Sequence, residues 1–175
     1  MEFIGRYIEK AVSTDIKRKM VFVGGPRQTG KTTLAKHICE KSGLAVEKRY
    51  LNWDAGEDRE NIMRERFPAG PGLLILDEVH KYSRWRQVVK GLFDKRGHEL
   101  QILVTGSARL DYYRRGGDSL QGRYHFYRLF PLSCAELGCA TISTINDLLT
   151  YGGFPEPFLL QSEKESRRWS RECRS

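Results

Sequence analysis

A short apolar run that stops at a glycine-rich turn is the strongest constraint on the fold of this 175-residue sequence. Residues 20–23 are all apolar, as in a parallel strand that is buried on both faces, and Gly24 and Gly25 follow them. The next residues read Gly-Pro-Arg-Gln-Thr-Gly-Lys-Thr, and Thr32 to Lys41 then has the apolar spacing of a helix. A strand that enters a helix through such a turn restricts the chain to a small set of α/β folds.

The turn fits the pattern G-x-x-x-x-G-K-[ST], the Walker A phosphate loop, in the strand-to-helix context that the pattern requires. Gly25 and Gly30 allow the backbone to wrap a diphosphate, so that successive N–H groups point at the anion at a helix N-terminus. We predict that Lys31 reaches the β and γ phosphates. We expect Thr32 to bind Mg²⁺, which prefers hard oxygen donors. The predicted nucleotide-binding residues of the loop are Gly25, Pro26, Arg27, Gln28, Thr29, Gly30, Lys31, Thr32 and Thr33.

A second apolar run ends at two carboxylates. Residues 73–76 are followed by Asp77 and Glu78, the pattern of a Walker B strand. Such a strand places Asp77 beside the metal at the neighbouring loop, so Asp77 is the second predicted Mg²⁺ ligand. Glu78 stands where the strand ends and is suited to orient and polarise water for attack on the γ phosphate. We therefore predict Glu78 as the general base.

Hydroxyl side chains follow the strand that is predicted over residues 100–104. If this strand is inserted between the other two, Thr105 or Ser107 lies between the phosphate loop and the acidic pair, where a hydroxyl could sense the γ phosphate. An ordinary Thr-Gly-Ser turn explains the same residues equally well. The sequence does not distinguish between the two hydroxyls.

The predicted elements alternate between strand and helix. We expect strands over residues 20–23, 48–52, 73–76, 100–104 and 124–129, and helices over 3–12, 32–41, 57–67 and 85–95. By the right-handed crossover rule, this alternation gives a parallel sheet between two helical layers, a three-layer α/β/α fold. In the last of these helices, Trp85, Val88, Val89, Leu92 and Phe93 are predicted core residues. Residues 109–121 are expected to form a mobile loop, and Ser133 is expected to cap a short helix.

The composition suits one α/β domain with a small appendage. The formal charge of +8 favours polyanionic partners, although a bound nucleotide would also use basic residues. The four cysteines lack the spacing of a zinc site, and the sequence shows neither a signal peptide nor a membrane span. We expect a soluble, cytoplasmic protein.

Together these motifs resemble the AAA+ superfamily, in particular a bacterial and archaeal group of predicted ATPases with a C-terminal domain of unknown function. The similar segments are 25–34, 76–80, 105–107, 119–123 and 131–137, within residues 6–158. The resemblance implies a P-loop NTPase sheet of the ASCE type, strand order 5-1-4-3-2, and hydrolysis of ATP with Mg²⁺. It also implies that Arg123 answers the γ phosphate, in cis or from a neighbouring copy, whereas a plain salt bridge explains this arginine equally well.

The resemblance also implies a division of the chain. Residues 1–142 would form the AAA-type P-loop ATPase domain with its N-terminal helix, and residues 143–175 the start of a helical C-terminal region. In that group the Gly152–Pro155 segment leads to further helices and a second domain, so this chain looks like an N-terminal fragment.

ATP hydrolysis that drives a conformational switch, in a partner or in the missing C-terminal part, is the function that these features favour. A small-molecule kinase uses the same loop, with 109–123 as its lid, but Glu78 favours water as the acceptor. A nucleic-acid-binding module is left open, and so are a homo-oligomer and a partner protein. The residues that could contact DNA are Lys81, Arg84, Trp85, Arg86, Lys90, Lys95, Arg96, Arg114, Arg115 and residues 123–128.

Overall fold

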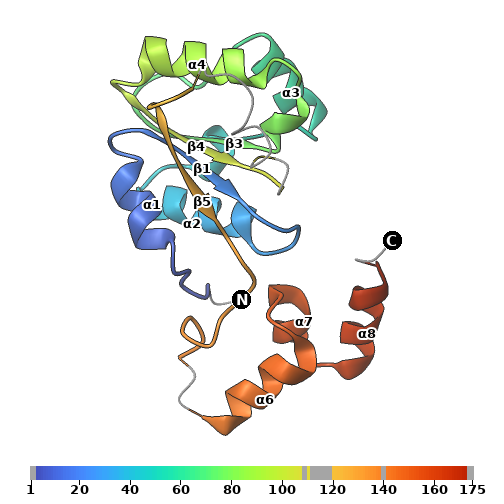
Figure 1. The fold of residues 1–175 in the computed structure, drawn as a ribbon. Helices are drawn as coiled ribbons and strands as arrows, with labels where there is room; N and C mark the ends of the chain where they lie inside the picture. The colour runs from blue at the N-terminus through green and yellow to red at the C-terminus, as the bar shows by residue number, and fades with distance from the viewer. Residues whose placement is uncertain (1–2, 108–109, 111–119, 139–140, 173–175) are drawn as a thin grey trace.

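The strands form one parallel sheet at the centre of the structure (Figure 1). A computed structural model describes residues 3–107, 110, 120–138 and 141–172. The strands run in the order β2-β3-β4-β1-β5, and every neighbouring pair is parallel. This is the predicted order 5-1-4-3-2 read from the other edge, so the expected sheet is confirmed. The strands are β1 (Met20–Gly24), β2 (Tyr50–Asn52), β3 (Gly72–Asp77), β4 (Leu100–Thr105) and β5 (Tyr124–Arg128).

Helices cover both faces of the sheet, which gives the three layers that the sequence predicts (Figure 1). Helices α1 (Glu9–Asp15) and α2 (Lys31–Lys41) cover one face, and α3 (Gly56–Met63) and α4 (Trp85–Arg96) cover the other. Because side chains alternate along a strand, Val21 and Val23 face the first pair of helices and Phe22 faces the second. The central strands are buried on both sides, which explains their continuous apolar runs.

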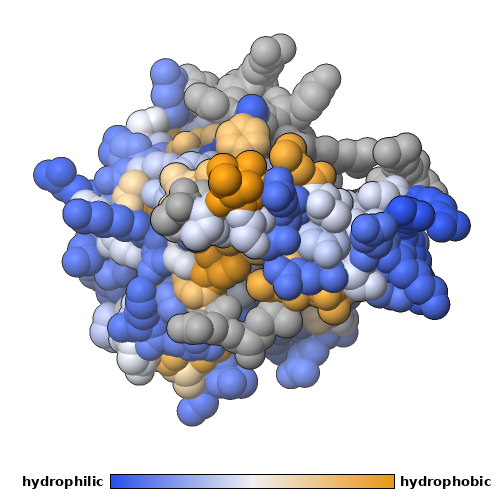
Figure 2. All heavy atoms as spheres, turned by 90° about the horizontal axis from the view of Figure 1, so that it is seen from below, coloured by the Kyte–Doolittle hydropathy of each residue, from blue (hydrophilic) through white to orange (hydrophobic). Residues whose placement is uncertain are grey.

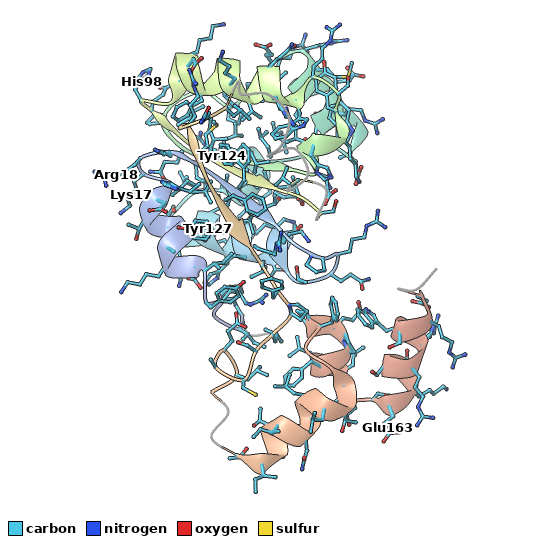
Figure 3. The ribbon with its side chains drawn as sticks, viewed as in Figure 1. Lys17, Arg18, His98, Tyr124, Tyr127 and Glu163 are labelled. Atoms are coloured by element: carbon cyan, nitrogen blue, oxygen red, sulfur yellow. The ribbon has the colours of Figure 1, made fainter. Side chains whose placement is uncertain are left out.

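Two tyrosines of the edge strand β5 show the same alternation (Figure 3). Tyr124 stacks on Phe22, with ring centroids 4.4 Å apart, on the α4 side of the sheet. The Tyr127 hydroxyl donates to Asp15 Oδ2 at 2.5 Å on the α1 side. This hydrogen bond, with burial, raises the pKa of Tyr127 to about 12. The bond holds the end of α1 against the edge strand.

Three predicted elements differ from the structure at their ends. The helix expected over residues 3–12 begins only at Glu9, because the segment before it runs along the domain and is held by the side chain of Arg6. The strand expected from Lys48 begins at Tyr50, since Val46–Lys48 forms a 3₁₀ turn. Helix α3 ends at Met63, four residues earlier than expected. The end of α3 is local, since Glu65 has a φ of 53° and Arg66 N donates to Asn61 O at 2.7 Å.

The prediction that Ser133 caps a helix is wrong, although the capping interactions exist. The Ser133 hydroxyl and N–H both donate to Glu136 Oε2, at 2.8 and 2.9 Å. The chain then makes only a turn, which ends at Gly138 with a φ of 59°. A left-handed glycine directly after one turn ends the helix before it can propagate. The loop predicted over 109–121 lies outside the described residues except for Leu110, Leu120 and Gln121.

Three helices after the sheet form a separate small cluster beside the phosphate loop: α6 (Ile142–Tyr151), α7 (Pro155–Leu160) and α8 (Glu163–Glu172) (Figure 1). Leu132 N donates to Gly153 O at 2.6 Å and joins this cluster to the segment after β5. Apolar side chains gather on the face of the molecule that Figure 2 shows from below. The exposed large apolar residues of α6 and α7 are Ile142, Ile145, Leu149, Leu159 and Leu160. Among the described helices, none has the length and apolar character needed to cross a membrane.

The core can be tested with one substitution at two positions. Leu74 of β3 is 0% exposed, so Leu74→Ala should lower the free energy of unfolding by about 2–5 kcal/mol, through lost burial and a cavity. Leu149 of α6 is 81% exposed, and Leu149→Ala should change that free energy by less than about 0.5 kcal/mol. Urea denaturation measures both. Equal effects of the two substitutions would contradict this assignment of the core.

Candidate nucleotide-binding site

The register of the sheet brings the predicted site residues to one edge. Asp77 at the end of β3 lies beside Thr105 at the end of β4, and Thr105 lies beside Val23 of β1. The phosphate loop starts directly after β1. As predicted, Thr105 therefore stands between the loop and the acidic pair, at the edge of the sheet formed by the carboxyl ends of the strands.

The phosphate loop uses glycine where the backbone has no room for a side chain. Leu129 N donates to Gly24 O at 2.8 Å, and this draws the end of β5 against the loop. A Cβ at Gly25 would lie 2.2 Å from Leu129 O, so no other residue fits there without moving the backbone. Gly30 has a φ of 87°, in the left-handed region that glycine tolerates. These two positions are the glycines of the Walker A pattern.

The loop ends at the first turn of α2. The first backbone bond of this helix runs from Leu34 N to Gly30 O, at 2.9 Å. The N–H groups of Lys31, Thr32 and Thr33 consequently have no acceptor within the helix, and an anion can receive them. Their partial positive charge faces the end of the loop, as in other phosphate-binding helix N-termini.

Lys31 is a buried cation without a paired carboxylate among the described residues. Its Nζ donates to Pro26 O at 2.5 Å, inside its own loop. Burial lowers the pKa of Lys31, while the charges of Glu78 and Asp77 act in the opposite direction. An anion at the loop would repay part of the desolvation of this ammonium group.

Asp77 accepts hydrogen bonds from hydroxyls on three different elements. Thr32 Oγ1 of α2 donates to Oδ2 at 2.8 Å, and Tyr50 Oη of β2 donates to the same oxygen at 2.6 Å. Thr105 Oγ1 of β4 donates to Oδ1 at 2.5 Å. Burial, followed by the hydrogen bond to Asp77, raises the pKa of the Tyr50 phenol, which keeps it a donor.

The oxygens of Thr32 and Asp77 fit a magnesium ion that is shared with a bound nucleotide. Both are hard oxygen donors, and they are already adjacent at 2.8 Å. The described residues contain no group of three or more His, Cys, Asp or Glu side chains that could hold a metal by themselves. Mg²⁺ is commonly held by one or two protein oxygens together with water and substrate phosphates, so this small donor set is sufficient.

Glu78 has a strained backbone at the end of β3. Its φ is 57°, which is unusual for a residue with a side chain, and its N–H donates to Thr105 O at 2.9 Å. Glu78 Oε2 lies 3.5 Å from Lys81 Nζ and 3.8 Å from His80 Nε2. Strain of this kind is concentrated at functional sites, where surrounding contacts hold it in place.

The two hydroxyls that the sequence could not separate have different partners. Thr105 uses its one hydroxyl proton on Asp77, so this side chain acts on the site through the carboxylate. Ser107 Oγ lies 3.2 Å from His80 Nε2. Gly106 permits this contact, because a Cβ there would lie 2.5 Å from His80 Nδ1.

Arg123 lies at the other end of the strands from the phosphate loop. The prediction that it answers the γ phosphate of its own chain is therefore wrong. Its carbonyl accepts from Met20 N at 3.1 Å, at the start of β1, whereas the phosphate loop follows the end of that strand. A strand of five residues separates the two by about 16 Å. Arg123 Nε donates to Asp94 Oδ1 at 3.0 Å, so the salt-bridge alternative is confirmed. Arg123 cannot answer a nucleotide of its own chain from this position, and a role toward a neighbouring copy stays a prediction.

Two site residues escaped the sequence analysis. Tyr50 of the edge strand β2 donates to Asp77 Oδ2 at 2.6 Å. Arg6 Nη1 donates to Thr29 O in the phosphate loop, also at 2.6 Å. Arg6 left no distinctive signal, because it falls on the polar side of the helical pattern that includes Ile4 and Ile8. Tyr50 left none, since a half-buried strand tyrosine is common.

Comparison with solved structures supports the same fold. The Thermotoga maritima RuvB Holliday junction branch migration motor matches 95% of this chain and 62% of its own, with a TM-score of 0.59 and 17% identity. AMPPCP-bound DnaA from Aquifex aeolicus matches 99% of this chain and 68% of its own, with a TM-score of 0.58 and 15% identity. At these identities the likeness establishes the fold.

Two sequence relatives are longer than this chain and match it over part of their length. Protein Rv2008c of Mycobacterium tuberculosis is 27% identical over 158 residues, which are 86% of this chain and 33% of the relative. Replication-associated recombination protein A of Bacillus subtilis is 27% identical over 109 residues, 62% of this chain and 25% of its own length. The chain thus spans about a third or less of these relatives.

The family assignment rests on the part of the chain that contains the site. The model of the AAA domain family AAA_14 matches residues 17–138, from the start of β1 to the turn after β5. The match contains the phosphate loop, the acidic pair and the Thr-Gly-Ser turn. With the strand order described above, it confirms the predicted resemblance to P-loop ATPases of the AAA+ type. The chain belongs to the AAA domain family.

Proposed function

We propose that this chain binds ATP with Mg²⁺ at the phosphate loop and hydrolyses it, and that hydrolysis switches the position of a C-terminal region or of a partner. The observation that carries the proposal is the pair of opposite buried charges at one edge of the sheet. Lys31 and Asp77 are both buried and are not paired with each other. A triphosphate with a divalent cation supplies an anion for the first and a cation for the second.

The loop residues and the start of α2 bind the phosphates in this proposal. Backbone N–H groups between Gly25 and Thr33 surround the β phosphate, and Lys31 moves from Pro26 O to the β and γ phosphates. Thr32 and Asp77 hold the Mg²⁺, which, when bound, neutralises charge on the phosphate oxygens. Tyr50 and Thr105 fix the carboxylate of Asp77 from its two sides.

Glu78 acts as the general base. It takes a proton from water as the water oxygen bonds to the γ phosphorus, while the bond from that phosphorus to the departing ADP oxygen breaks. Ser107, next to His80, is the hydroxyl left to sense the γ phosphate, because Thr105 is engaged with Asp77. Arg123 serves a neighbouring copy if the chain assembles, since it lies too far from its own loop.

The division of the chain is part of the proposal. Residues 1–142 act as the ATPase domain, and residues 143–175 begin the helical region that responds to it. Helix α7 begins beside the phosphate loop and packs against α6 and α8, so the three helices are placed to detect its occupancy. A Cβ at Gly30 would lie 4.0 Å from Pro155 Cγ at the start of α7.

DNA is the partner that we propose for the basic edge of the domain. Lys17, Arg18 and Lys19 follow α1 and have no ion pair among the described residues, and they line a hollow of about 100 Å³ with His98. Figure 3 shows Lys17, Arg18 and His98 at the same edge. Glu99 also lines the hollow, but Arg96 Nε binds it at 2.5 Å. One relative is named for replication-associated recombination.

Several of the DNA residues predicted from the sequence are less suitable. Trp85 is buried, which confirms it as a core residue and leaves it unavailable for stacking on bases. Lys81 and Arg96 are paired with acidic side chains, and Arg123 is paired with Asp94. Arg114 and Arg115 lie outside the described residues.

Substitutions at Lys31 and Glu78 should distinguish nucleotide binding from ATP turnover. Lys31→Ala removes the buried cation, and we expect it to abolish detectable binding of ATP in Mg²⁺. Glu78→Gln keeps the side-chain shape without the base, and we expect it to bind ATP while turnover falls by about 10²-fold or more. Isothermal titration calorimetry and phosphate release measure the two quantities. Transfer of phosphate to a small acceptor instead of water would identify a kinase, and an intact wild-type fold without nucleotide affinity would refute the proposal.

The hydroxyl of Tyr50 should affect Mg²⁺ binding through its hydrogen bond to Asp77. Tyr50→Phe removes one of the three donors to the carboxylate and retains the ring, which lies under Lys36 Nζ at 4.4 Å. We expect the Mg²⁺ concentration at half-maximal ATP binding to rise by about tenfold, since a hydrogen bond to a charged group contributes about 1.5–3 kcal/mol. Tyr124→Phe is the matched control, because that hydroxyl has no hydrogen bond among the described residues. An unchanged Mg²⁺ requirement in Tyr50→Phe would show that this bond does not position the carboxylate.

The basic edge should control non-specific DNA affinity. The triple variant Lys17→Gln, Arg18→Gln, Lys19→Gln should bind random duplex more weakly and reduce the slope of log affinity against log salt by up to about 3. Lys81→Gln removes one paired lysine and should leave the slope nearly unchanged. Fluorescence anisotropy at several salt concentrations measures the slope. The DNA proposal fails if the wild-type chain does not bind duplex at low salt.

A further inference from the structure

Arg6 is a buried arginine whose three bonds join segments far apart in the sequence. The residue is 7% exposed and belongs to no helix or strand. Nη1 donates to Thr29 O at 2.6 Å, Nη2 to Phe130 O at 2.6 Å, and Nε to Glu136 Oε1 at 2.8 Å. A planar guanidinium can satisfy three such acceptors at fixed angles, which a lysine ammonium on a flexible chain does not reproduce.

The bond to Thr29 O fixes the direction of a phosphate-loop donor. In a trans peptide the carbonyl of Thr29 and the N–H of Gly30 point in opposite directions. Arg6 holds the carbonyl on the outside of the loop, so the Gly30 N–H faces the other side. A Cβ on Gly30 would lie only 3.5 Å from Arg6 Nη1, which shows how closely the guanidinium rests on the loop. Charge-assisted bonds of this type are stronger than neutral ones.

The other two bonds reach the segment that leads to the C-terminal helices. Phe130 and Glu136 lie between β5 and α6, and Leu132 in the same segment binds Gly153 O. Glu136 also accepts from Tyr7 N at 3.0 Å and from Ser133. Burial acts to raise the pKa of Glu136, but the hydrogen bonds from Arg6, Tyr7 and Ser133 hold it below its usual value. The Arg6 guanidinium therefore contacts both the phosphate loop and the segment 130–136, which leads to α6, α7 and α8.

We propose that Arg6 is a positioning residue that presents the Gly30 N–H to the phosphates and links occupancy of the loop to the C-terminal helices. The inference rests on the nucleotide site proposed above. A phosphate that accepts from Gly30 N–H polarises the peptide and strengthens the acceptor that Arg6 holds. By linkage, the arrangement of the segment around Phe130 and Glu136 then affects nucleotide affinity, and nucleotide affects that arrangement by the same factor.

Two substitutions separate positioning from a structural role. Arg6→Lys keeps a positive charge beside Glu136 and loses the fork to the two carbonyls. Glu136→Gln weakens the ion pair and keeps those two contacts. We expect Arg6→Lys to weaken ATP and ADP binding about tenfold, and Glu136→Gln to lower the thermal midpoint while it weakens binding less than Arg6→Lys does. Arg64→Lys, at an arginine whose side chain is 58% exposed, is the control and should match the wild type.

Hydrogen exchange of residues 142–172 tests the link to the helices. With a saturating non-hydrolysable ATP analogue we expect slower exchange there in the wild type and no such change in Arg6→Lys. The inference is overturned if Arg6→Lys binds nucleotide as the wild type does, if Glu136→Gln loses as much affinity as Arg6→Lys, or if both proteins show the same exchange response. A wild-type chain that binds no nucleotide would overturn the proposed function and this inference together, whereas normal binding with an unaffected Arg6→Lys overturns this inference alone.

Discussion

The buried carboxylate of Asp77 is the interaction on which the site depends. A carboxylate that loses water needs hydrogen bonds to replace it, and here hydroxyls from α2, β2 and β4 provide them. These bonds fix the ends of three neighbouring elements relative to one another. Because Thr32 belongs to the first turn of α2, the same carboxylate also sets the position of the phosphate loop. The geometry of the site is therefore part of the core packing.

Opposite charges are distributed over the site without neutralising each other. Lys31 donates to a carbonyl in its own loop, and within the part of the chain that the structure describes, the donors to the Asp77 carboxylate are neutral hydroxyls. Direct pairing of these two side chains would satisfy both and leave nothing to attract a charged ligand. The strained backbone of Glu78 adds a further local cost. The fold bears these costs because the sheet strands beside the site are buried and apolar on both faces.

Patterns of adjacent residues predict the parallel sheet and the loop, whereas the strand order was implied by the family resemblance. Continuous apolar runs identify β1, β3 and β4, and the glycine spacing identifies the turn between β1 and α2. The turn after Ser133 is ended locally by the left-handed Gly138, whereas the start of α1 at Glu9 depends on bonds from Arg6 to distant segments. Tyr50 and Arg6 were missed for the same reason, since their partners lie 27 and 23 residues away.

The family resemblance identified Arg123 as a candidate residue, but it did not predict where Arg123 lies in the sheet. The resemblance put an arginine after the loop that is predicted over residues 109–121, and the sequence has one there. The register of β5 against β1 decides where it lies, because Tyr124 pairs with Met20 and Arg128 with Gly24. A residue just before β5 must therefore stand at the start of β1, away from the phosphates. The residues that directly follow β1 and β3 lie beside the site, whereas Arg123 directly precedes β5 and lies at the other end of the strands. Glu136 follows β5 and pairs with Arg6, and it is the Arg6 guanidinium of this pair that contacts the loop, at Thr29 O.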